Sequence, residues 1–352
     1  MTVAEKHIKL LVQMLAIPSL SRNEDTRAGF LFNWLKTEGY TVVRIANNLM
    51  VTHGSDPSEA SVILNSHIDT VPPGDGWDSD PYLPVRKEGK ITGLGSNDAG
   101  ASVVSLLGAF STLSAHPKAG ELALLITAEE EVSGANGISS LIPLFKNLKF
   151  ALVGEPTGMD AAVAERGLMV VDAVATGVQG HAARGEGVNA IYKAMEDIER
   201  ITRLEFSEHS RWLRDPSLNV TVIQAGSKHN VVPGKCEFVI DVRSNDHYSN
   251  ERLLQILRET CSSEMQERSM RLRSSCLPDE HPVFSLIEKY GMKPFGSPTL
   301  SDMALLSVPS LKLGPGHSSR SHTANEYILE DEIKGAIPLY ENLIADILNA
   351  DL

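Results

Sequence analysis

Three short apolar runs in the first half of the chain each end in acidic or histidine side chains. Residues 61–66, 122–126 and 150–153 form the runs, which lead into His67-Ile68-Asp69, Glu129-Glu130-Glu131 and Gly154-Glu155-Pro156, respectively. Continuous apolar runs of this length are typical of buried strands. Because ligands bind at the carboxyl ends of strands in open α/β sheets, these residues predict one site built from several loops.

Helical patterns flank the predicted strands along the chain. An apolar stripe at helical spacing ends before Pro18, and a second helix is expected over 26–38. A helix rich in small residues follows Asp98, and the chain returns to helix from Glu330 onward. Strands that alternate with helices favour an α/β/α catalytic domain around a central, mostly parallel sheet.

The middle of the chain has a different pattern. Three segments alternate apolar and polar residues as half-buried strands do: 168–175, 219–224 and 236–242. Helical stripes lie between and after them, which indicates a small two-layer α+β unit of the ferredoxin-like kind. We therefore predict that an inserted domain, 167–276, divides a catalytic domain into the parts 1–166 and 277–352.

The charge balance limits the partners. The chain has 32 Lys and Arg against 45 Asp and Glu, a formal net charge of −13. This argues against nucleic acid and membrane as partners and favours a cationic small substrate. No run of about 18 apolar residues occurs, and charged residues interrupt the N-terminal apolar pattern, unlike in a signal peptide. We expect a cytoplasmic protein whose three cysteines are reduced thiols.

Seven acids and histidines at loop positions are the candidates for chemistry. They are His67, Asp69, Asp98, Glu130, Glu131, Glu155 and His322. Hydrolysis of an amide at neutral pH needs a strong nucleophile and a polarised carbonyl, and a divalent metal supplies both. Two metals about 3.5–4 Å apart can share the task when imidazole and carboxylate ligands hold them.

The candidates suffice for such a pair. His67 and Glu155 can hold one ion, and Glu131 and His322 the other. Asp98 can bridge the two. Mixed imidazole and carboxylate ligation suits two Zn²⁺ ions per subunit, and cobalt or manganese also fits.

Two further carboxylates complete the predicted centre. Glu130 is left free to act as the general base, which takes a proton from the attacking water and passes it to the leaving nitrogen. Asp69 lies two residues after His67, so on a strand end the two side chains share a face. Asp69 can then accept the second imidazole N–H and orient the ring.

Each signal also has a simpler interpretation. An acidic run such as Glu129–Glu131 is commonly a solvated loop. Four other histidines are expected to be structural: His53, His229, His281 and His317. A binding protein without catalysis is disfavoured because Glu130 is present, and a serine hydrolase is disfavoured because no G-x-S-x-G motif occurs.

Eight motifs, taken in order, resemble one family from end to end. They are Ser66–Pro72, Gly93–Asp98, Thr127–Glu131, Gly154–Thr157, Gly180-His181, Asn230–Pro233, Asp241–Arg243 and Ser321–Glu326. The chain resembles the M20 metallopeptidases, and within them the branch of acetylornithine deacetylase and succinyl-diaminopimelate desuccinylase. The resemblance implies a di-zinc centre on His67, Asp98, Glu131, Glu155 and His322, with Glu130 as base and Asp69 as the orienting acid.

The resemblance also implies a role for the inserted domain. In the family this domain is a lid that forms a homodimer interface. A histidine that matches His181 reaches the substrate carbonyl oxygen, usually in the neighbouring subunit. Asn230 and Arg243 match lid residues that hold the substrate, and a guanidinium suits a carboxylate. The simpler interpretation of Arg243 is a surface ion pair.

Some positions depart from the family pattern. Ala99-Gly100-Ala101 follows Asp98 where the family usually has a lysine, Leu94 replaces a common arginine, and Glu129 replaces an aspartate. These features resemble the acetylornithine deacetylases of Bacteroidetes-type bacteria. The expected reaction is hydrolysis of N-acetyl-L-ornithine or N-succinyl-L-ornithine in arginine biosynthesis. A dipeptidase or a succinyl-diaminopimelate desuccinylase is the alternative.

Overall fold

The computed structural model describes residues 1–350 and divides the chain into two compact units. Unit 1 consists of Met1–Val163, Leu277–Phe295 and the segment from Ser301 onward, and unit 2 of Ala164–Cys276 and Gly296–Leu300. The inserted unit therefore begins three residues before the predicted boundary. It also includes Gly296–Leu300, which we had assigned to the catalytic domain. The backbone of Gly296 packs so closely on Trp212 that an added Cβ would lie 2.0 Å from the Trp212 carbonyl oxygen.

A nine-stranded sheet forms the centre of the fold of unit 1. Its four central strands run parallel in the order β6 (Leu122–Thr127), β3 (Val62–His67), β7 (Phe150–Val153) and β17 (Ser310–Lys312). Antiparallel strands extend both sides: β2 (Asn48–Thr52) and β1 (Thr41–Ile45) beside β6, and β8 (Ala161–Glu165) beside β17. Every residue of β3, β6 and β7 is buried, as continuous apolar runs predict.

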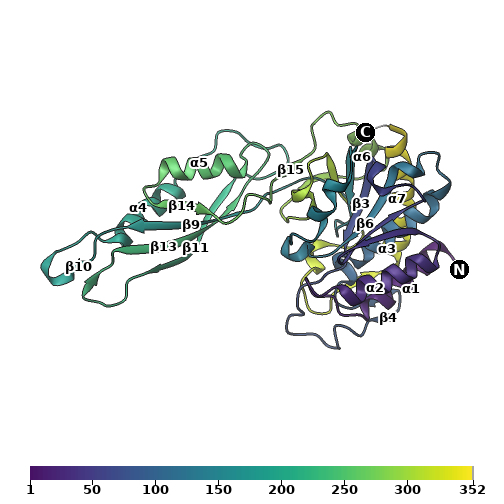
Figure 1. The fold of residues 1–352 in the computed structure, drawn as a ribbon, viewed down its shortest axis with the longest axis horizontal. Coiled ribbons are helices and arrows are strands. Elements are labelled where there is room, and N and C mark those ends of the chain that lie inside the picture. Colours follow the sequence, from purple (N-terminus) through teal and green to yellow (C-terminus); the bar gives the residue numbers. More distant parts are fainter. Residues whose placement is uncertain (351–352) are drawn as a thin grey trace. The chain divides into compact units, whose positions relative to one another are not determined.

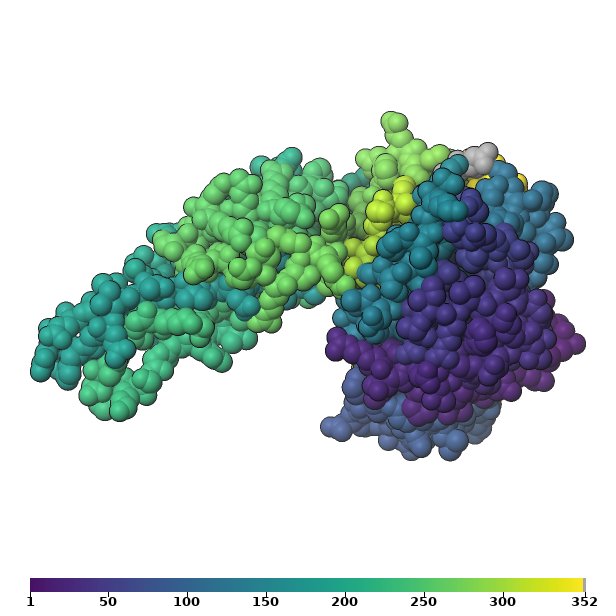
Figure 2. All heavy atoms as spheres, viewed as in Figure 1, coloured from purple at the N-terminus to yellow at the C-terminus, as the bar shows by residue number. Residues whose placement is uncertain are grey.

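Helices α1 (Val3–Leu15), α3 (Ala101–Thr112) and α7 (Glu330–Ala350) pack against one another beside this sheet (Figure 1). The predicted α/β class is confirmed. Helix α1 begins at the N-cap Thr2, whose hydroxyl accepts a hydrogen bond from the Glu5 N–H at 3.2 Å. Helix α2 (Asp25–Thr37) contacts β1 and β2. The first fifty residues form a continuous part of the surface of unit 1 in Figure 2.

The helical segment Ser96–Ala115, which contains α3, is long and apolar enough to cross a membrane by length and composition alone. In its most apolar stretch, 72% is buried inside the structure. The small side chains of α3 let it pack closely between the sheet and α7. We therefore interpret it as a core helix.

The remaining elements of unit 1 are short. Strands β4 (Val85–Lys87), β5 (Lys90–Thr92) and β18 (Tyr327–Leu329) form a small antiparallel sheet, and β16 (Pro294–Ser297), at the boundary with unit 2, pairs with β8. Helix α6 (Val283–Lys289) packs on α7. Helix α7 continues through Pro338 to its end, so this proline lies in the helix interior.

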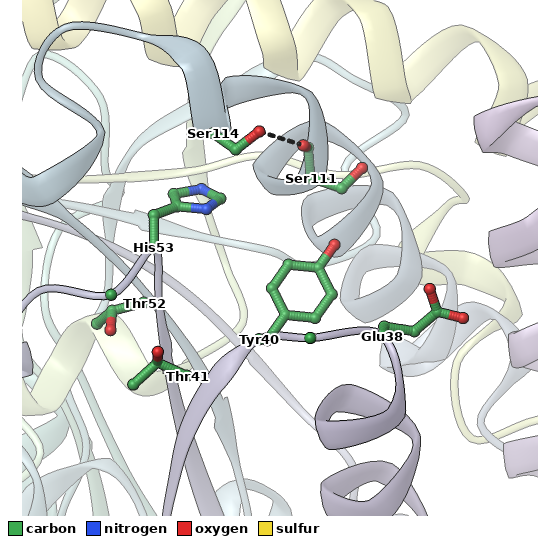
Figure 3. Close-up of a pocket in the computed structure, with 9 residues that line it drawn as sticks. Glu38, Tyr40, Thr41, Thr52, His53, Ser111 and Ser114 are labelled. Atoms are coloured by element: carbon green, nitrogen blue, oxygen red, sulfur yellow. Dashed lines mark hydrogen bonds between the residues drawn. The ribbon is translucent and has the colours of Figure 1, made fainter.

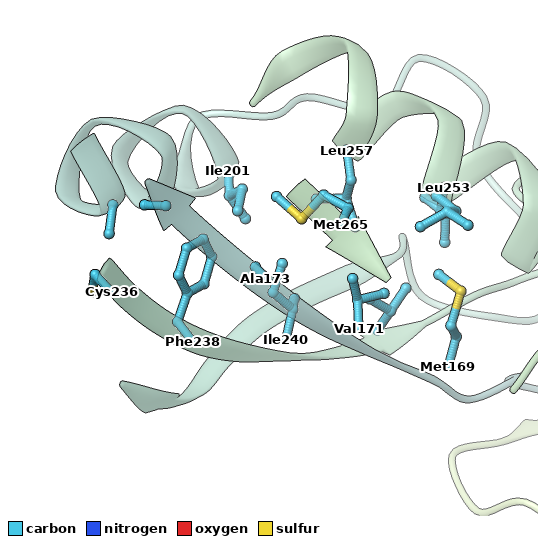
Figure 4. Close-up of a cluster of buried hydrophobic side chains, with 14 of the residues drawn as sticks. Met169, Val171, Ala173, Ile201, Cys236, Phe238, Ile240, Leu253, Leu257 and Met265 are labelled. Carbon is cyan, nitrogen blue, oxygen red and sulfur yellow. The ribbon is translucent and has the colours of Figure 1, made fainter. Parts of the chain in front are cut away.

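Unit 2 is a four-stranded antiparallel sheet covered by two helices. The strand order is β11 (Ser217–Ala225), β13 (Lys235–Arg243), β9 (Met169–Thr176) and β14 (Glu264–Glu267). Alternate residues of β9 and β13 face α4 (Ala190–Thr202) and α5 (Asn250–Thr260), and Figure 4 shows Val171, Phe238 and Ile240 in this core. The short strands β10 (Gly180–His181) and β12 (Val231–Val232) pair with each other, and β15 (Ser275–Cys276) pairs with β8.

Candidate metal centre

His67 is the last residue of β3, and its imidazole is buried among carboxylates. Its Nε2 lies 3.3 Å from Asp98 Oδ1 and 3.6 Å from Glu155 Oε1. Asp98 lies where the backbone kinks in the short helical segment Ser96–Gly100 before α3, and Glu155 follows β7, the parallel neighbour of β3. Because parallel strands end at the same edge of a sheet, residues 67 and 155 meet although 88 positions separate them.

A second histidine faces the other side of Asp98. His322 Nε2 lies 3.0 Å from Glu131 Oε2 and 3.6 Å from Asp98 Oδ2. One oxygen of Asp98 is thus near His67 and the other near His322, which is the arrangement of a bridging carboxylate. The structure therefore brings together all five residues that we predict as metal ligands.

Left-handed backbone conformations support this arrangement. His322 has φ 58°, and Glu129, which precedes the two site glutamates, has φ 58°. Such a conformation costs about 1–3 kcal/mol in a residue other than glycine, and it persists where the surroundings hold it. Glu129 is held by Asn136, whose side-chain amide donates to the Glu129 carboxylate at 2.9 Å. The carboxylate of Glu129 therefore shapes the turn and is not part of the cluster.

Glu130 lies at the edge of the same cluster. Its Oε2 is 3.8 Å from His67 Nε2. Two groups of side chains have their potential ligand atoms within 4.8 Å of one another: His67, Asp98 and Glu131, and His67, Glu130 and Glu155. Burial, together with the negative charges of Glu155 and Asp302, raises the pKa of Glu130 well above its usual value. A carboxyl with a raised pKa is suited to proton transfer near neutral pH.

Asp69 has two contacts that differ in kind. Its backbone carbonyl lies 3.0 Å from His67 Nδ1, and its carboxylate is slightly farther away at 3.4 Å. The carboxylate also accepts hydrogen bonds from the N–H groups of Glu130 and Glu131, each at 3.1 Å, and from the Ser21 hydroxyl at 2.8 Å. Asp69 therefore fixes both the histidine ring and the turn that carries the two glutamates.

Glu326 is a residue of the centre to which the sequence analysis gave no role. It is 2% exposed, and its carboxylate accepts hydrogen bonds from the backbone N–H groups of Gly95, Asn97 and Asp98 at 3.0, 2.8 and 2.9 Å. Burial raises its pKa to about 7. Because these bonds hold the segment that ends in Asp98, Glu326 positions the Asp98 carboxylate. Its position in the motif Ser321–Glu326 is the sequence signal from which a role of Glu326 could have been inferred.

Asp302 is the second residue that the sequence analysis missed. Its carboxylate accepts hydrogen bonds from the Asn65 amide at 2.7 Å and the Thr127 hydroxyl at 3.2 Å, which lie near the ends of β3 and β6. Burial raises its pKa to about 6. A lone acid after a serine carried no pattern that distinguished it from a loop residue.

The electrostatics of the cluster favour a bound cation. Burial, with the charges of Asp98 and Glu131, raises the pKa of Glu155 to about 8. Glu155 Oε1 is buried and has no hydrogen-bond partner among residues 1–350. A hydrogen bond to Glu131 raises the pKa of His322 to about 9. Clustered carboxylates with an unpartnered oxygen fit divalent metal ions, which these side chains would hold through oxygen and imidazole nitrogen.

The predicted substrate residues all lie in unit 2. His181 and Asn230 are exposed, and the Asn230 carbonyl accepts a hydrogen bond from the Ala182 N–H at 3.1 Å. Arg243 is at the far end of β13, where its guanidinium pairs with Asp241 at 2.8 and 3.0 Å. The structure therefore brings His181 and Asn230 together but leaves Arg243 apart from them. Arg243 forms an ion pair with Asp241, as a surface arginine would.

A separate pocket of about 440 Å³ lies in unit 1 at the ends of α2 and α3 (Figure 3). Tyr40, Thr41 and Ser111 contribute hydroxyl groups to its wall. His53, which also lines it, stacks on Phe110 with 3.9 Å between ring centroids.

The fold and this cluster define a metal-dependent hydrolase. The model of peptidase family M20/M25/M40 matches residues 63–346, and the chain belongs to this family. It is 28% identical to an acetylornithine deacetylase of Proteus mirabilis, over 91% of each chain. It is 26% identical to a succinyl-diaminopimelate desuccinylase of Stenotrophomonas maltophilia, over 97% of this chain and 99% of that protein.

Solved structures share the fold at lower identity. Aminopeptidase PepT of Bacillus cereus superposes with a TM-score of 0.76 at 20% identity and covers 98% of both chains. The YXEP protein of Bacillus subtilis, a dinuclear metal binding peptidase of the M20 family, superposes with a TM-score of 0.75 at 14% identity and covers 99% of both chains. The predicted family, fold class and hydrolase activity are confirmed.

Proposed function

We propose that the protein is a di-metal amidohydrolase that removes the acyl group from a small N-acyl-L-amino acid, with N-acetyl-L-ornithine or N-succinyl-L-ornithine as the preferred substrate. The observation that carries the proposal is the buried cluster of His67, Asp98 and Glu155 with Glu130 beside it. The named relatives that match nearly the whole chain act on N-acylated amino acids. The net charge of −13 suits a cationic substrate such as an acyl-ornithine.

The proposed ligands fall into two sets that share Asp98. His67 and Glu155 would hold one ion, and Glu131 and His322 would hold the other. When bound, the pair would lower the pKa of the attacking water and polarise the scissile carbonyl. Zinc suits this ligand set.

Glu130 carries the proton in this proposal. It takes a proton from the attacking water and delivers it to the leaving nitrogen, so that the amine departs as a neutral group. Burial raises the pKa of Glu130, which makes its carboxylate a stronger acceptor for the proton of the attacking water. The Asp69 carboxylate accepts a hydrogen bond from the backbone N–H of Glu130, which keeps Glu130 in place.

We further propose a homodimer formed through unit 2. His181 and Asn230 adjoin the Lys235 end of β13, and Arg243 is at its other end. Eight residue steps of strand span roughly 26 Å, which exceeds the length of a small N-acyl amino acid. One copy of unit 2 therefore cannot bring both ends to one substrate, and we assign His181 and Arg243 at each site to different copies.

Unit 2 offers an apolar surface for this pairing. Tyr192 and Met195 on α4 are 65% and 58% exposed, and Val222 and Ile223 on the edge strand β11 are 45% and 51% exposed. Exposed apolar side chains along an unpaired edge strand are typical of an interface. Sedimentation should give a dimer that Met195→Glu dissociates, while Leu83→Glu, at an exposed leucine of unit 1, leaves it intact. A fully active monomer would refute the dimer.

A substrate panel tests the activity. We expect turnover of acetylornithine or succinylornithine to exceed that of acetylcitrulline, succinyl-diaminopimelate and dipeptides, and a chelator to abolish it. Glu130→Gln is the matched inactive control, because it preserves the shape of the side chain. Preferred cleavage of dipeptides would identify a peptidase instead, and preferred cleavage of succinyl-diaminopimelate a desuccinylase of that substrate. We expect the protein to act in the cytoplasm in arginine biosynthesis.

A further inference from the structure

Unit 2 contains a pocket of about 320 Å³ that plays no part in the proposed hydrolysis. Its lining residues are Arg166, Trp212, Leu213, Arg214, Gly296, Ser297 and Pro298. The lining holds two arginines and no acidic side chain, in a chain whose net charge is −13. A concentration of positive charge in so acidic a protein indicates an anionic ligand.

The apolar wall of the pocket depends on a close approach of two backbone segments. A Cβ added to Gly296 would lie 2.0 Å from the Trp212 carbonyl oxygen and 2.9 Å from the Leu213 side chain. Glycine at position 296 therefore lets these segments meet. Trp212, Leu213 and Pro298 then line the same space. A ligand in this pocket meets hydrocarbon as well as charge.

Arg166 is held in place at the pocket by the surrounding backbone. Its Nη2 donates to the Asp215 carbonyl at 2.9 Å and to the Ser217 hydroxyl at 3.0 Å. Its Nε is buried and has no hydrogen-bond partner within the described part of the chain. A buried N–H without a partner is costly, and a ligand oxygen is one way to supply the acceptor.

Neighbouring positive charges also disfavour the charged form of Arg166. Burial lowers the pKa of Arg166, and the neighbouring guanidinium groups of Arg243 and Arg214 lower it further. Asp241, which pairs with Arg243, offsets part of this effect, and Asp215 pairs with His209. An anion between Arg166 and Arg214 would further offset the repulsion between the guanidinium groups.

We propose that this pocket binds a small organic carboxylate. The carboxylate accepts hydrogen bonds from Arg166 and Arg214, and its hydrocarbon chain packs on Trp212, Leu213 and Pro298. Guanidinium groups suit carboxylates because the planar fork of N–H donors matches the two oxygens. A pocket of about 320 Å³ accommodates a ligand of only a few carbon atoms. The proposal goes beyond the hydrolytic function and requires no turnover.

The test is a calorimetric titration of the metal-loaded protein with succinate at low ionic strength. Arg214→Ala is the main variant, because Arg214 contributes charge to the pocket and its side chain is exposed at the surface. We expect it to weaken succinate binding about tenfold or more, as the loss of a charge-assisted hydrogen bond does. Arg166→Lys keeps the charge but loses the fork, and it should weaken binding as well.

Arg268→Ala is the matched control. It removes one exposed arginine of unit 2, which pairs with Asp172 at 2.7 Å, and it should change the affinity less than twofold. Three results would overturn the proposal: no saturable binding to the wild-type protein, equal affinity in Arg214→Ala, or binding that a chelator abolishes while Arg214→Ala does not alter it. Inorganic phosphate that binds as tightly as succinate would refute the assignment to a carboxylate.

Discussion

The residues proposed for chemistry are arranged in opposite ways in the two units. In unit 1 they come from distant segments and lie around a buried centre: His67 and Asp69 are each 1% exposed, and His322 is the one exposed member. In unit 2 His181 and Asn230 are on the surface, at the opposite end of the sheet from Arg243. Folding of unit 1 therefore brings its proposed ligands together without any contribution from unit 2. In our proposal the polar groups of unit 2 act only when a substrate or a second chain contacts them.

The sharpest test of this contrast is Glu130→Ala. We expect kcat to fall by about 10²–10⁴, the usual contribution of a positioned acid–base group. Metal content measured by atomic emission should stay at the wild-type level, because five other side chains are proposed as ligands. Glu131→Ala is the companion variant and should lose metal as well as activity. Turnover retained in Glu130→Ala would refute the assigned role.

His181→Ala tests the exposed unit. We expect kcat to fall by about 10²–10³, as it does when a donor to a developing oxyanion is removed, with metal content unchanged. His209→Ala, at another exposed histidine of unit 2, serves as the control and should retain activity. If kcat of His181→Ala stays near the wild-type value, His181 makes no such contact with the substrate, and its proposed role is refuted.

Glu326→Gln tests whether the buried Glu326 supports metal binding by holding Asp98 in place. The substitution keeps the shape of the side chain but turns one acceptor into a donor that faces backbone N–H groups. We expect the affinity for Zn²⁺ to fall by about 10–100-fold, the typical effect of a partner that orients a ligand. Competition with a chromophoric chelator measures this. The exposed Glu88→Gln is the control, and equal affinities in the two variants would contradict a positioning role.

The smallest effect concerns stability and pH. His7 is buried in α1, and burial lowers its pKa from the ordinary 6.5. As the pH falls through 6.5, the unfolded chain takes up a proton that folded His7 resists, so the free energy of unfolding decreases. Between pH 7.5 and 5.5 we expect His7 to contribute a loss of about 1 kcal/mol. Urea unfolding should show a smaller pH dependence for His7→Gln, and parallel curves would contradict this.

Two residues of the centre show why sequence patterns missed part of it. Each predicted ligand follows a buried strand or lies in a motif of several residues, so local sequence marks it. Asp302 and Glu326 act through backbone and side-chain hydrogen bonds to segments more than 170 residues away. No local period or spacing encodes a contact of this kind, because the partners are set by how the loops fold together.

The sequence alone determined the α/β class, the family and the set of acids and histidines that we propose as metal ligands. Burial of apolar strands is a local property that residue type and spacing record directly. Tertiary structure decided the rest. It placed Asp98 between two histidines, assigned Glu326 and Asp302 to hold the loops, and separated His181 from Arg243 by the length of β13. The physical reason is that distances between side chains depend on strand register and loop packing, which only the folded chain fixes.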